Sequence, residues 1–519
     1  MILFFRQVIA SLLLSLLVIG ATNISGLLPN QTKLNSGDIS HHIQCIKYDS
    51  TQKLIDVRCK SIHLTDIYNQ LSNSSILGIE NSNDGYNSSL KNGKVWILHA
   101  GIVVGKEGSL IIDSSDTSWL KITSTPTLQL KQVASNITDK EEGNNSKPTE
   151  QTHIDTDTEN STSNTEGNNI IIVSKNNADS PNGIHVHGSL KIDSVKITSW
   201  DPEKNDVIKL AFGKRGGEEH TKSDYDTAEP RAFIRISKLA NGTTNITNSE
   251  LAYLGYSCSR CSGLSYYGGE GSIIKRNDIH HLLKGFYSKN TGHLIIDSNK
   301  FHDNYLYGID PHTGSHDMVI TDNLVYNNNA SGIICSKDCY NLLIEGNEVY
   351  NNTGAARGIA FSINTTHSVA KNNYIHDQPR CISFNRGSDH NAVYNNTISN
   401  CKTGVNLANT GNNSIYNNTI SSTQNGITVE NVKNKIYNNK ISLAKYGIVF
   451  ELPPSNRTNN FVSANSTTTD NYHNSYPIEI LDENHFSDTK NLLVLKKQPL
   501  NRIEVEEPNE KNSTSALDN

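Results

Sequence analysis

Short apolar runs alternate with polar turns along most of this chain, and apolar residues at helical spacing are rare. The runs Val95–Ile97, Gly101–Val104 and Ser109–Asp113 illustrate the pattern, because glycine and polar residues separate them. Such runs predict short β-strands. The composition agrees, since Asn and Ser are frequent, Met and Trp are scarce, and β-branched residues alternate with polar ones. We therefore predict an all-β fold.

From about Asn248 the pattern repeats at intervals of 21–26 residues. Each repeat has an Asn before a short apolar element and a Gly followed by an aliphatic or aromatic residue. This period, with short strands and Asn-rich turns, predicts a solenoid, here a right-handed parallel β-helix. The Asn positions are Asn277, Asn299, Asn323, Asn347, Asn373, Asn396, Asn418 and Asn439. The Gly positions are Gly285, Gly308, Gly332, Gly358, Gly404, Gly426 and Gly447, and Cys381 replaces Gly in one repeat.

Overlaying the repeats by their glycines separates inward from outward positions. The residues one and three after Gly are mostly apolar, so strand alternation points them into the core. We expect Ile309, Ile333 and Ile359 to stack there. The residues before Gly, and two and four after it, then point outward. Stacked strands lie about 4.8 Å apart, so each outward position forms a ladder on one face.

The pattern also divides the chain into parts. Residues 134–169 are almost all polar and cannot form a core, and Pro453-Pro454 interrupts the last strands. The predicted parts are residues 1–21, a signal peptide or N-terminal anchor; 22–95, an N-terminal β region; 96–133, the start of the β-helix; 134–169, a disordered insertion; 170–452, the main β-helix; and 453–519, a C-terminal cap and polar tail.

Residues 1–21 are typical of a targeting segment. Arg6 precedes the apolar run Val8–Ile19, and Gly20 and Ala21 offer a cleavage point. The segment is either cleaved as a signal peptide or retained as an anchor, and a membrane is a partner only if it is retained. We expect the rest of the chain to be extracytoplasmic, secreted or at the cell surface.

Eight cysteines fit an oxidising compartment and favour disulfides, although the sequence does not give their pairing. The motif Cys258-x-x-Cys261 alone would suggest zinc or redox chemistry, but no second such pair accompanies it. Several Asn-x-Ser/Thr sequons make glycosylation a further hypothesis. They include Asn23, Asn160 and Asn364.

The formal net charge of −6 gives no sign of a nucleic-acid partner. Basic and amide side chains nevertheless gather at outward positions of consecutive coils. A local basic stripe on an acidic protein favours a polyanionic ligand. For an exported β-helix we expect an acidic polysaccharide, a polyuronate, bound by a monomer. The candidate binding residues are Lys284, Lys289, Lys337, Arg357, Arg380, Asn385 and Arg386.

An acid, an imidazole and a phenol come together in Tyr307-Gly308-Ile309-Asp310-Pro311-His312. Asp310 and His312 are two residues apart, so they share one face at roughly 6.6 Å along a strand. Tyr307 precedes them in a turn. These groups suit proton abstraction from a sugar carbon beside a carboxylate, which needs a base, an opposite-face acid and a group that neutralises the carboxylate.

Two other interpretations of these residues remain open. An outward Asp and His can be ordinary solvated residues or part of a turn network. The cluster Asp310, His312, His316 and Asp317 can also be a metal site. Pro311 at an inward position argues for a specialised local shape. We assign no cofactor and no metal; calcium stays an open alternative, although no motif indicates it.

The segment 307–312 resembles the signature of the mannuronan C5-epimerases, right-handed β-helix enzymes of alginate biosynthesis. The resemblance covers roughly residues 95–450 outside the insertion. It extends to the segments Val195–Asp201, Arg231–Arg235, Glu250–Tyr256, Ser262–Leu264 and Gly332–Lys337.

This resemblance implies that Tyr307, Asp310 and His312 are catalytic. His312 would be the base and Tyr307 the opposite-face acid, with the roles exchanged for the opposite epimer. Asp310 would hold the uronate carboxylate as a protonated acid. Lys337, Arg357 and Arg380 would bind neighbouring carboxylates. The chain departs from periplasmic members of the family where they tend to have a further acid, an Arg and a His, namely at Thr313, Lys337 and Tyr305.

The resulting expectation is an exported isomerase that converts mannuronate to guluronate within a polymer. A polysaccharide lyase on the same substrates is one alternative, because it begins with the same proton abstraction. A non-catalytic surface β-helix, such as an adhesin, is another. A periplasmic copper-associated β-helix is disfavoured because the chain contains only 2 Met.

Overall fold

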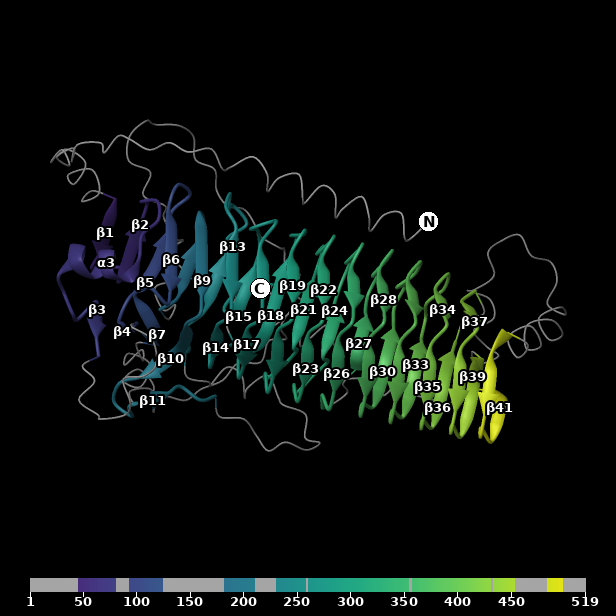
Figure 1. Ribbon diagram of the computed structural model, residues 1–519. Helices are drawn as coiled ribbons and strands as arrows, with labels where there is room; N and C mark the ends of the chain where they lie inside the picture. Colours follow the sequence, from purple (N-terminus) through teal and green to yellow (C-terminus); the bar gives the residue numbers. More distant parts are fainter. Residues whose placement is uncertain are drawn as a thin grey trace, which may run out of the picture. The chain divides into compact units, whose positions relative to one another are not determined.

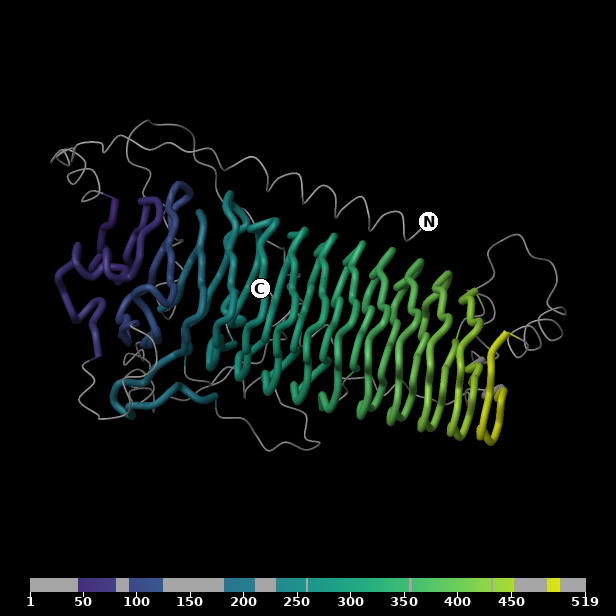
Figure 2. Tube along the Cα trace, in the orientation of Figure 1, coloured from purple at the N-terminus to yellow at the C-terminus, as the bar shows by residue number. Residues whose placement is uncertain are grey.

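The computed structural model describes residues 45–80, 93–124, 182–210, 230–257, 260–353, 357–430, 433–452 and 483–497. These residues form a right-handed parallel β-helix, as the repeat predicted. Three sheets run along it, and each regular coil gives one strand to each sheet. The successive coils are seen side by side in Figure 1, and Figure 2 follows the chain from one coil to the next.

The first sheet carries the residues of interest on its outer face. It joins β1 to β2 antiparallel and continues in parallel from β2 onward. Its strands, in spatial order, are β1 (Ile46–Asp49), β2 (Leu54–Val57), β5 (Gly101–Val104), β8 (Ile184–Val186), β12 (Ile234–Ile236), β15 (Gly263–Tyr266), β18 (Lys284–Lys289), β21 (Ile309–His312), β24 (Ile333–Cys335), β27 (Arg357–Phe361), β30 (Arg380–Phe384), β33 (Thr403–Leu407), β36 (Asn425–Val429), β39 (Tyr446–Leu452) and β41 (Asn491–Lys497).

The second and third sheets complete each coil with shorter strands, most of them three residues long with the middle residue buried. The second sheet contains β3 (Leu77–Ile79), β4 (Lys94–Leu98), β7 (Thr117–Thr123), β10 (Lys196–Asp201), β14 (Glu250–Ala252), β17 (Asp278–His280), β20 (Lys300–His302), β23 (Leu324–Tyr326), β26 (Glu348–Tyr350), β29 (Tyr374–His376), β32 (Thr397–Ser399), β35 (Thr419–Ser421), β38 (Lys440–Ser442) and β40 (His485–Ser487), with β11 (Asp206–Val207) paired to β10. The third contains β6 (Ser109–Asp113), β9 (Ser189–Asp193), β13 (Thr244–Thr247), β16 (Ile273–Lys275), β19 (Ile295–Asp297), β22 (Val319–Thr321), β25 (Leu343–Glu345), β28 (Val369–Lys371), β31 (Ala392–Tyr394), β34 (Ser414–Tyr416) and β37 (Lys435–Tyr437).

The overlay of repeats by their glycines is confirmed by the strand register. Ile309 pairs with Ile333, and Ile333 pairs with Ile359. All three are fully buried in one continuous hydrophobic core. The position two residues further is buried as well, and there the rings of Phe361 and Phe384 stack at 4.7 Å. The period-two alternation therefore correctly predicted which of these side chains point into the core of the solenoid.

The repeating asparagines form a buried ladder along the solenoid. Asn277 donates its backbone N–H to Oδ1 of Asn299 at 2.9 Å, and Asn299 does the same to Asn323. Each side-chain amide also donates to the carbonyl of an earlier coil. The ladder satisfies polar groups that the tight turns bury, each bond contributing about 1 kcal/mol. It continues through Asn347, Asn373, Asn396, Asn418, Asn439 and Asn484.

The two ends differ from the regular coils. Within the predicted N-terminal β region, α3 (Leu64–Leu71) packs Leu64 and Ile67 into the first coil. At the other end, β40 and β41 lie within the stretch expected to be a cap or tail, and they add a further coil to two of the sheets. The targeting segment 1–21 and the insertion 134–169 lie outside the described residues. Among those described, no helix combines the length and apolarity needed to span a bilayer.

Among the residues that the structure describes on both sides, disulfides join two cysteine pairs that are neighbours in sequence. Cys45 bonds to Cys59, and Cys381 bonds to Cys401. The remaining described pair is different, because Cys335 and Cys339 are free thiols buried in the core. Burial raises the pKa of the Cys335 thiol well above its usual value, so this group stays protonated and is no nucleophile.

Candidate functional site

The site is centred on β18 and β21, two adjacent strands of the first sheet. Their register places Tyr287 beside Asp310 and Lys289 beside His312. On the other side, β21 pairs with β24 through the single residue pair Ile309–Ile333. The sheet loosens after that pair, because Pro311 has no N–H to donate to a ladder. Its carbonyl still accepts the backbone N–H of Ser336 and the thiol of Cys339.

Asp310 lies under the surface in an ion pair. Its Oδ2 lies 3.2 Å from Nζ of Lys284, and its Oδ1 accepts a 2.6 Å hydrogen bond from Oγ of Ser336. The side chains of Lys284 and Asp310 are 2% and 0% exposed. The ammonium, the carboxyl group and the serine hydroxyl thus contact one another beneath the surface. This burial corrects the expected outward, open positions of Lys284 and Asp310.

Aromatic rings are the physical reason for this burial. Nζ of Lys284 lies 4.3 Å from the ring centroid of Tyr287 and 5.7 Å from that of Tyr307. The Tyr287 ring in turn lies 5.5 Å from the imidazole of His312. Side chains of neighbouring coils thus cover one another, so an outward position on this face need not be exposed. Tyr287 therefore lies between Lys284 and His312, while Tyr307 approaches Lys284 itself.

His312 has a defined tautomer in this structure. Its Nδ1 accepts the backbone N–H of Thr313 at 2.8 Å and also contacts Oγ1 of Thr313 at 2.7 Å. A backbone N–H can only donate, so Nδ1 is the nitrogen with the lone pair. The neutral imidazole therefore carries its hydrogen on Nε2. Thr313 is one of the positions where the chain departs from the periplasmic epimerases.

Two lysines flank His312 on the neighbouring coils. Lys289 is its direct register partner and is half-buried. Lys337 follows Ser336 in the next coil, and its carbonyl accepts the backbone N–H of Gly314. The Lys337 side chain is exposed. Cationic groups are thus available on both sides of the imidazole, where they can meet the carboxylates of a polyanionic chain.

The structure separates the remaining predicted binding residues. Arg357 and Arg380 pair in register on β27 and β30, as the ladder predicted. Arg357 is only 5% exposed, which corrects its expected place on an open face, whereas Arg380 is half-buried. Asn385 is half-buried and Arg386 is exposed at the end of β30. The open part of the stripe therefore lies at Lys337 and Arg386.

Sequence reasoning did not select Tyr287, Ser336 or Thr313 as site residues. Tyr287 and Ser336 occupy the same outward columns as Asp310 and His312, one coil before and one coil after. The sequence signal for these two residues is their position in the repeat. That position alone does not single them out, because Tyr and Ser are common on any strand face.

The metal cluster considered from the sequence does not form as expected. Both oxygens of Asp310 are occupied by Lys284 and Ser336. Ligand atoms of His316 and Asp317 approach those of His293 instead. Asp310 and His312 are therefore separate from that group.

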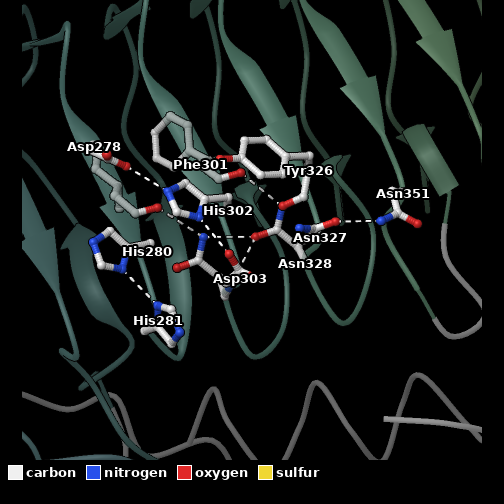
Figure 3. A network of polar contacts seen from close by, with 12 residues as sticks. Asp278, His280, His281, Phe301, His302, Asp303, Tyr326, Asn327, Asn328 and Asn351 are labelled. Carbon is white, nitrogen blue, oxygen red and sulfur yellow. Dashed lines mark hydrogen bonds and ion pairs between the residues drawn. The ribbon is translucent and has the colours of Figure 1, made fainter.

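A second histidine lies in the same coil with quite different surroundings. His302 on β20 contacts Asp278 through Nε2 at 2.8 Å and Asp303 through Nδ1 at 2.7 Å, as Figure 3 shows. Burial opposes its protonation, but hydrogen bonds to the two carboxylates outweigh burial and raise the pKa of His302. Its ring is stacked between those of His280 and Tyr326, at 5.0 Å and 4.8 Å.

Part of this sequence is similar to two known mannuronan C5-epimerases and to one family model. A mannuronan C5-epimerase of Pseudomonas fluorescens is 29% identical over 146 residues, and that of Pseudomonas aeruginosa is 28% identical over 145 residues. Each match covers 26% of this chain and 24% of the relative, so the similarity spans about a quarter of those proteins. A family model described as "Periplasmic copper-binding protein (NosD)" matches residues 241–426.

The fold resembles that of a solved structure over most of its length. The crystal structure of the periplasmic alginate epimerase AlgG superposes with a TM-score of 0.52 at 16% identity, covering 89% of each chain. The resemblance drawn from the segment 307–312 is thereby confirmed: this chain is a right-handed parallel β-helix similar in part of its sequence to the mannuronan C5-epimerases.

Proposed function

We propose that this protein is a polyuronate C5-epimerase that converts mannuronate to guluronate residues within an alginate-like polymer. The observation that carries the proposal is the placement of His312 beside the Tyr287–Lys284–Tyr307 group, with Lys289 and Lys337 on either side. The partial similarity to mannuronan C5-epimerases supports the same reaction.

The reaction requires two proton transfers at one carbon. A base removes the C5 proton, the C5–H electron pair moves into the adjacent carboxylate group, and an acid then delivers a proton to the opposite face of C5. Negative charge grows on the uronate carboxylate during this step, and fixed cations lower its cost. In this proposal Lys289 and Lys337 supply those cations, because Lys284 is already paired with Asp310.

The assignment of the two protons follows from the tautomer. Nε2 of neutral His312 carries a hydrogen, since Nδ1 accepts from the backbone of Thr313. In this proposal Tyr307 reacts as a phenolate beside the Lys284 ammonium, 5.7 Å from its ring, and becomes the phenol when it takes the C5 proton. Nε2–H of His312 delivers a proton to the opposite face of C5, and the phenol proton then returns to His312 through solvent, which restores both groups. This direction reverses the one that the family resemblance implies. Asp310 acts as a positioning residue, because its ion pair holds the Lys284 ammonium against the rings of Tyr287 and Tyr307.

Incubation of polymannuronate with the full chain in deuterated water, followed by proton NMR, tests the proposal. We expect guluronate signals and deuterium at C5. Unsaturated uronate ends would instead identify a lyase, which expels the C4 oxygen after the same abstraction. An unchanged polymer would contradict both enzymes and favour a carbohydrate-binding surface protein.

The same experiment with two variants tests the direction of transfer. Tyr307→Phe is expected to abolish C5 exchange, whereas His312→Gln is expected to retain exchange into mannuronate without forming guluronate. Loss of exchange in His312→Gln with exchange retained in Tyr307→Phe would return His312 to the role of base.

The proposed compartment and assembly go with this function. The periplasmic location named for the similar alginate epimerase suggests an extracytoplasmic protein. Residues 1–21 would then be its export signal or anchor, and an acidic polysaccharide its partner. We propose a monomer. Sedimentation of the secreted protein and sequencing of its N-terminus check these points.

A further inference from the structure

A histidine and carboxylate cluster lies in the stacked turns that follow β18 and β21. Nitrogen and oxygen ligand atoms of His293, His316 and Asp317 all lie within 4.8 Å of one another. The cluster is placed by stacking of coils, because Gly292 bridges to His316 and the carbonyl of His316 accepts the N–H of His293. It lies outside the proton-transfer site, and nothing in the proposed reaction uses it.

Gly292 makes room for the cluster. A Cβ atom at this position would overlap Nδ1 and Cε1 of His316, so any larger residue would displace the imidazole. The His316 ring is stacked flat on Tyr340 at 5.0 Å and 8°. It meets the ring of His293 edge-on at 5.6 Å. One imidazole is therefore held in a fixed plane, and an exposed one stands beside it.

Asp317 is also held from its far side. Its Oδ2 lies 2.8 Å from Nδ1 of His316, and its Oδ1 accepts a hydrogen bond from the Asn341 side chain at 3.2 Å. His293 and Asp317 both have positive φ, 56° and 50°, which fixes the backbone under them. Oriented ligands with supporting hydrogen bonds are what a metal site needs.

We propose that His293, His316 and Asp317 bind one divalent transition metal ion, zinc or copper(II). Two imidazoles and one carboxylate are ligands that these metals favour, whereas calcium requires six or more oxygen atoms. The metal takes the place of the proton shared by His316 and Asp317. The exposed His293 swings in as the third ligand, and water completes the coordination.

Other histidine groups in the described residues lack this combination. Both ring nitrogens of His302 are occupied by aspartates. The second cluster with metal-like spacing is His63, Asp113 and Asp116. There Asp113 pairs with Lys191, and Asp116 accepts two hydrogen bonds from Thr65. A lysine ammonium already supplies the cation in that cluster.

Calorimetric titration of the full chain with zinc chloride and with copper(II) chloride tests the proposal. We expect one tight equivalent, weakened at least tenfold in His293→Ala and in Asp317→Asn. His293 is exposed, so its removal leaves the fold intact. The matched control is His367→Ala: this exposed residue has the same positive φ and stacks on His390 at 5.5 Å, but it belongs to no carboxylate cluster.

A competing ion and a second variant decide the outcome. Excess calcium should not compete. The inference is overturned if His293→Ala binds as tightly as the wild type, or if His63→Ala removes the site instead. Because the readout is metal binding, it stands or falls independently of epimerase activity.

Discussion

His302 and His312 lie in one coil, yet their surroundings give them opposite properties. His302 sits between two aspartates, both ring nitrogens are occupied, and its pKa is raised. His312 receives a backbone N–H on Nδ1 and adjoins Tyr287 and a lysine-bearing strand. The first is suited to be a structural cation. The second, only 4% exposed, is the group to which the proposed function assigns a proton transfer.

This difference shows that a histidine's role on a β-helix is decided by its neighbours in adjacent coils. The ring faces of His302 are covered by His280 and Tyr326, so no sugar can stack there. On the first sheet the repeat is interrupted at Pro311, and polar groups there contact each other instead of forming a uniform ladder. The candidate site therefore lies where the repeat is broken.

Removing each imidazole gives the largest expected contrast. His312→Gln should lower epimerase turnover about 10²–10⁴-fold, the usual effect of losing a positioned acid or base. His302→Gln should leave turnover within about twofold, because it touches only the second sheet. Initial rates by NMR check this, with circular dichroism as the control for folding. Equal losses in the two variants would remove the distinction drawn above.

Removing the aspartate partner in each region should lower the free energy of unfolding by different amounts. Asp310→Ala leaves Lys284 buried without a counter-charge and should cost about 3–5 kcal/mol. Asp278→Ala breaks a pair at the surface, worth about 0–1 kcal/mol. Denaturant unfolding measures both.

Two further variants separate charge from packing. Asp310→Asn should be milder than Asp310→Ala, because the amide oxygen still accepts from Lys284. The double variant Lys284→Met/Asp310→Leu should recover most of the stability, since an apolar pair needs no desolvation. A double variant as unstable as Asp310→Ala would mean that packing, not charge, is at stake.

Polyuronate affinity should differ by a smaller factor between lysine variants on the first sheet and on the second sheet. Lys337→Ala and Lys289→Ala should each weaken polyuronate binding by up to about fivefold at low salt, the range of an exposed ion pair. The loss should shrink as salt is added. The matched control is Lys300→Ala, an exposed lysine on the second sheet beside His302. Equal weakening by Lys300→Ala would mean that the polymer binds without a preferred face.

The smallest expected effect is the change with pH in the contribution of His302 to stability. The folded-state pKa of His302 is raised, so its contribution is fully present below its unfolded value of about 6.5 and lost as pH rises through the folded value. The Tm difference between wild type and His302→Gln should therefore be larger at pH 5.5 than at pH 8.5. A difference that grows with pH would contradict a charged His302.

The sequence predicted those features that depend on the repeat. Apolar positions such as Ile309 and the Asn277 ladder follow from a fixed period, and the structure confirms them. Burial of Asp310 and Lys284 did not follow, because it depends on tyrosine rings from adjacent coils. The tautomer of His312 depends on the backbone of Thr313. The repeat period predicts which way a side chain points. Its burial and its contacts depend on the size and shape of the side chains in adjacent coils, which the period does not give.

The asparagine ladder has a consequence for how this chain tolerates changes of length. The backbone N–H of Asn439 donates to Oδ1 of Asn484 at 2.9 Å across 45 positions, and the same bond elsewhere joins residues 21–26 apart at 2.9–3.1 Å. Trp119 likewise reaches Thr198 across 79 positions. Neighbouring coils therefore form the same hydrogen bonds whatever the number of residues between them. A longer connection adds little entropic cost, because the cost of closing a loop grows slowly with its length. The junctions between coils are therefore suitable places to insert a foreign module, such as a reporter domain, without shifting any coil.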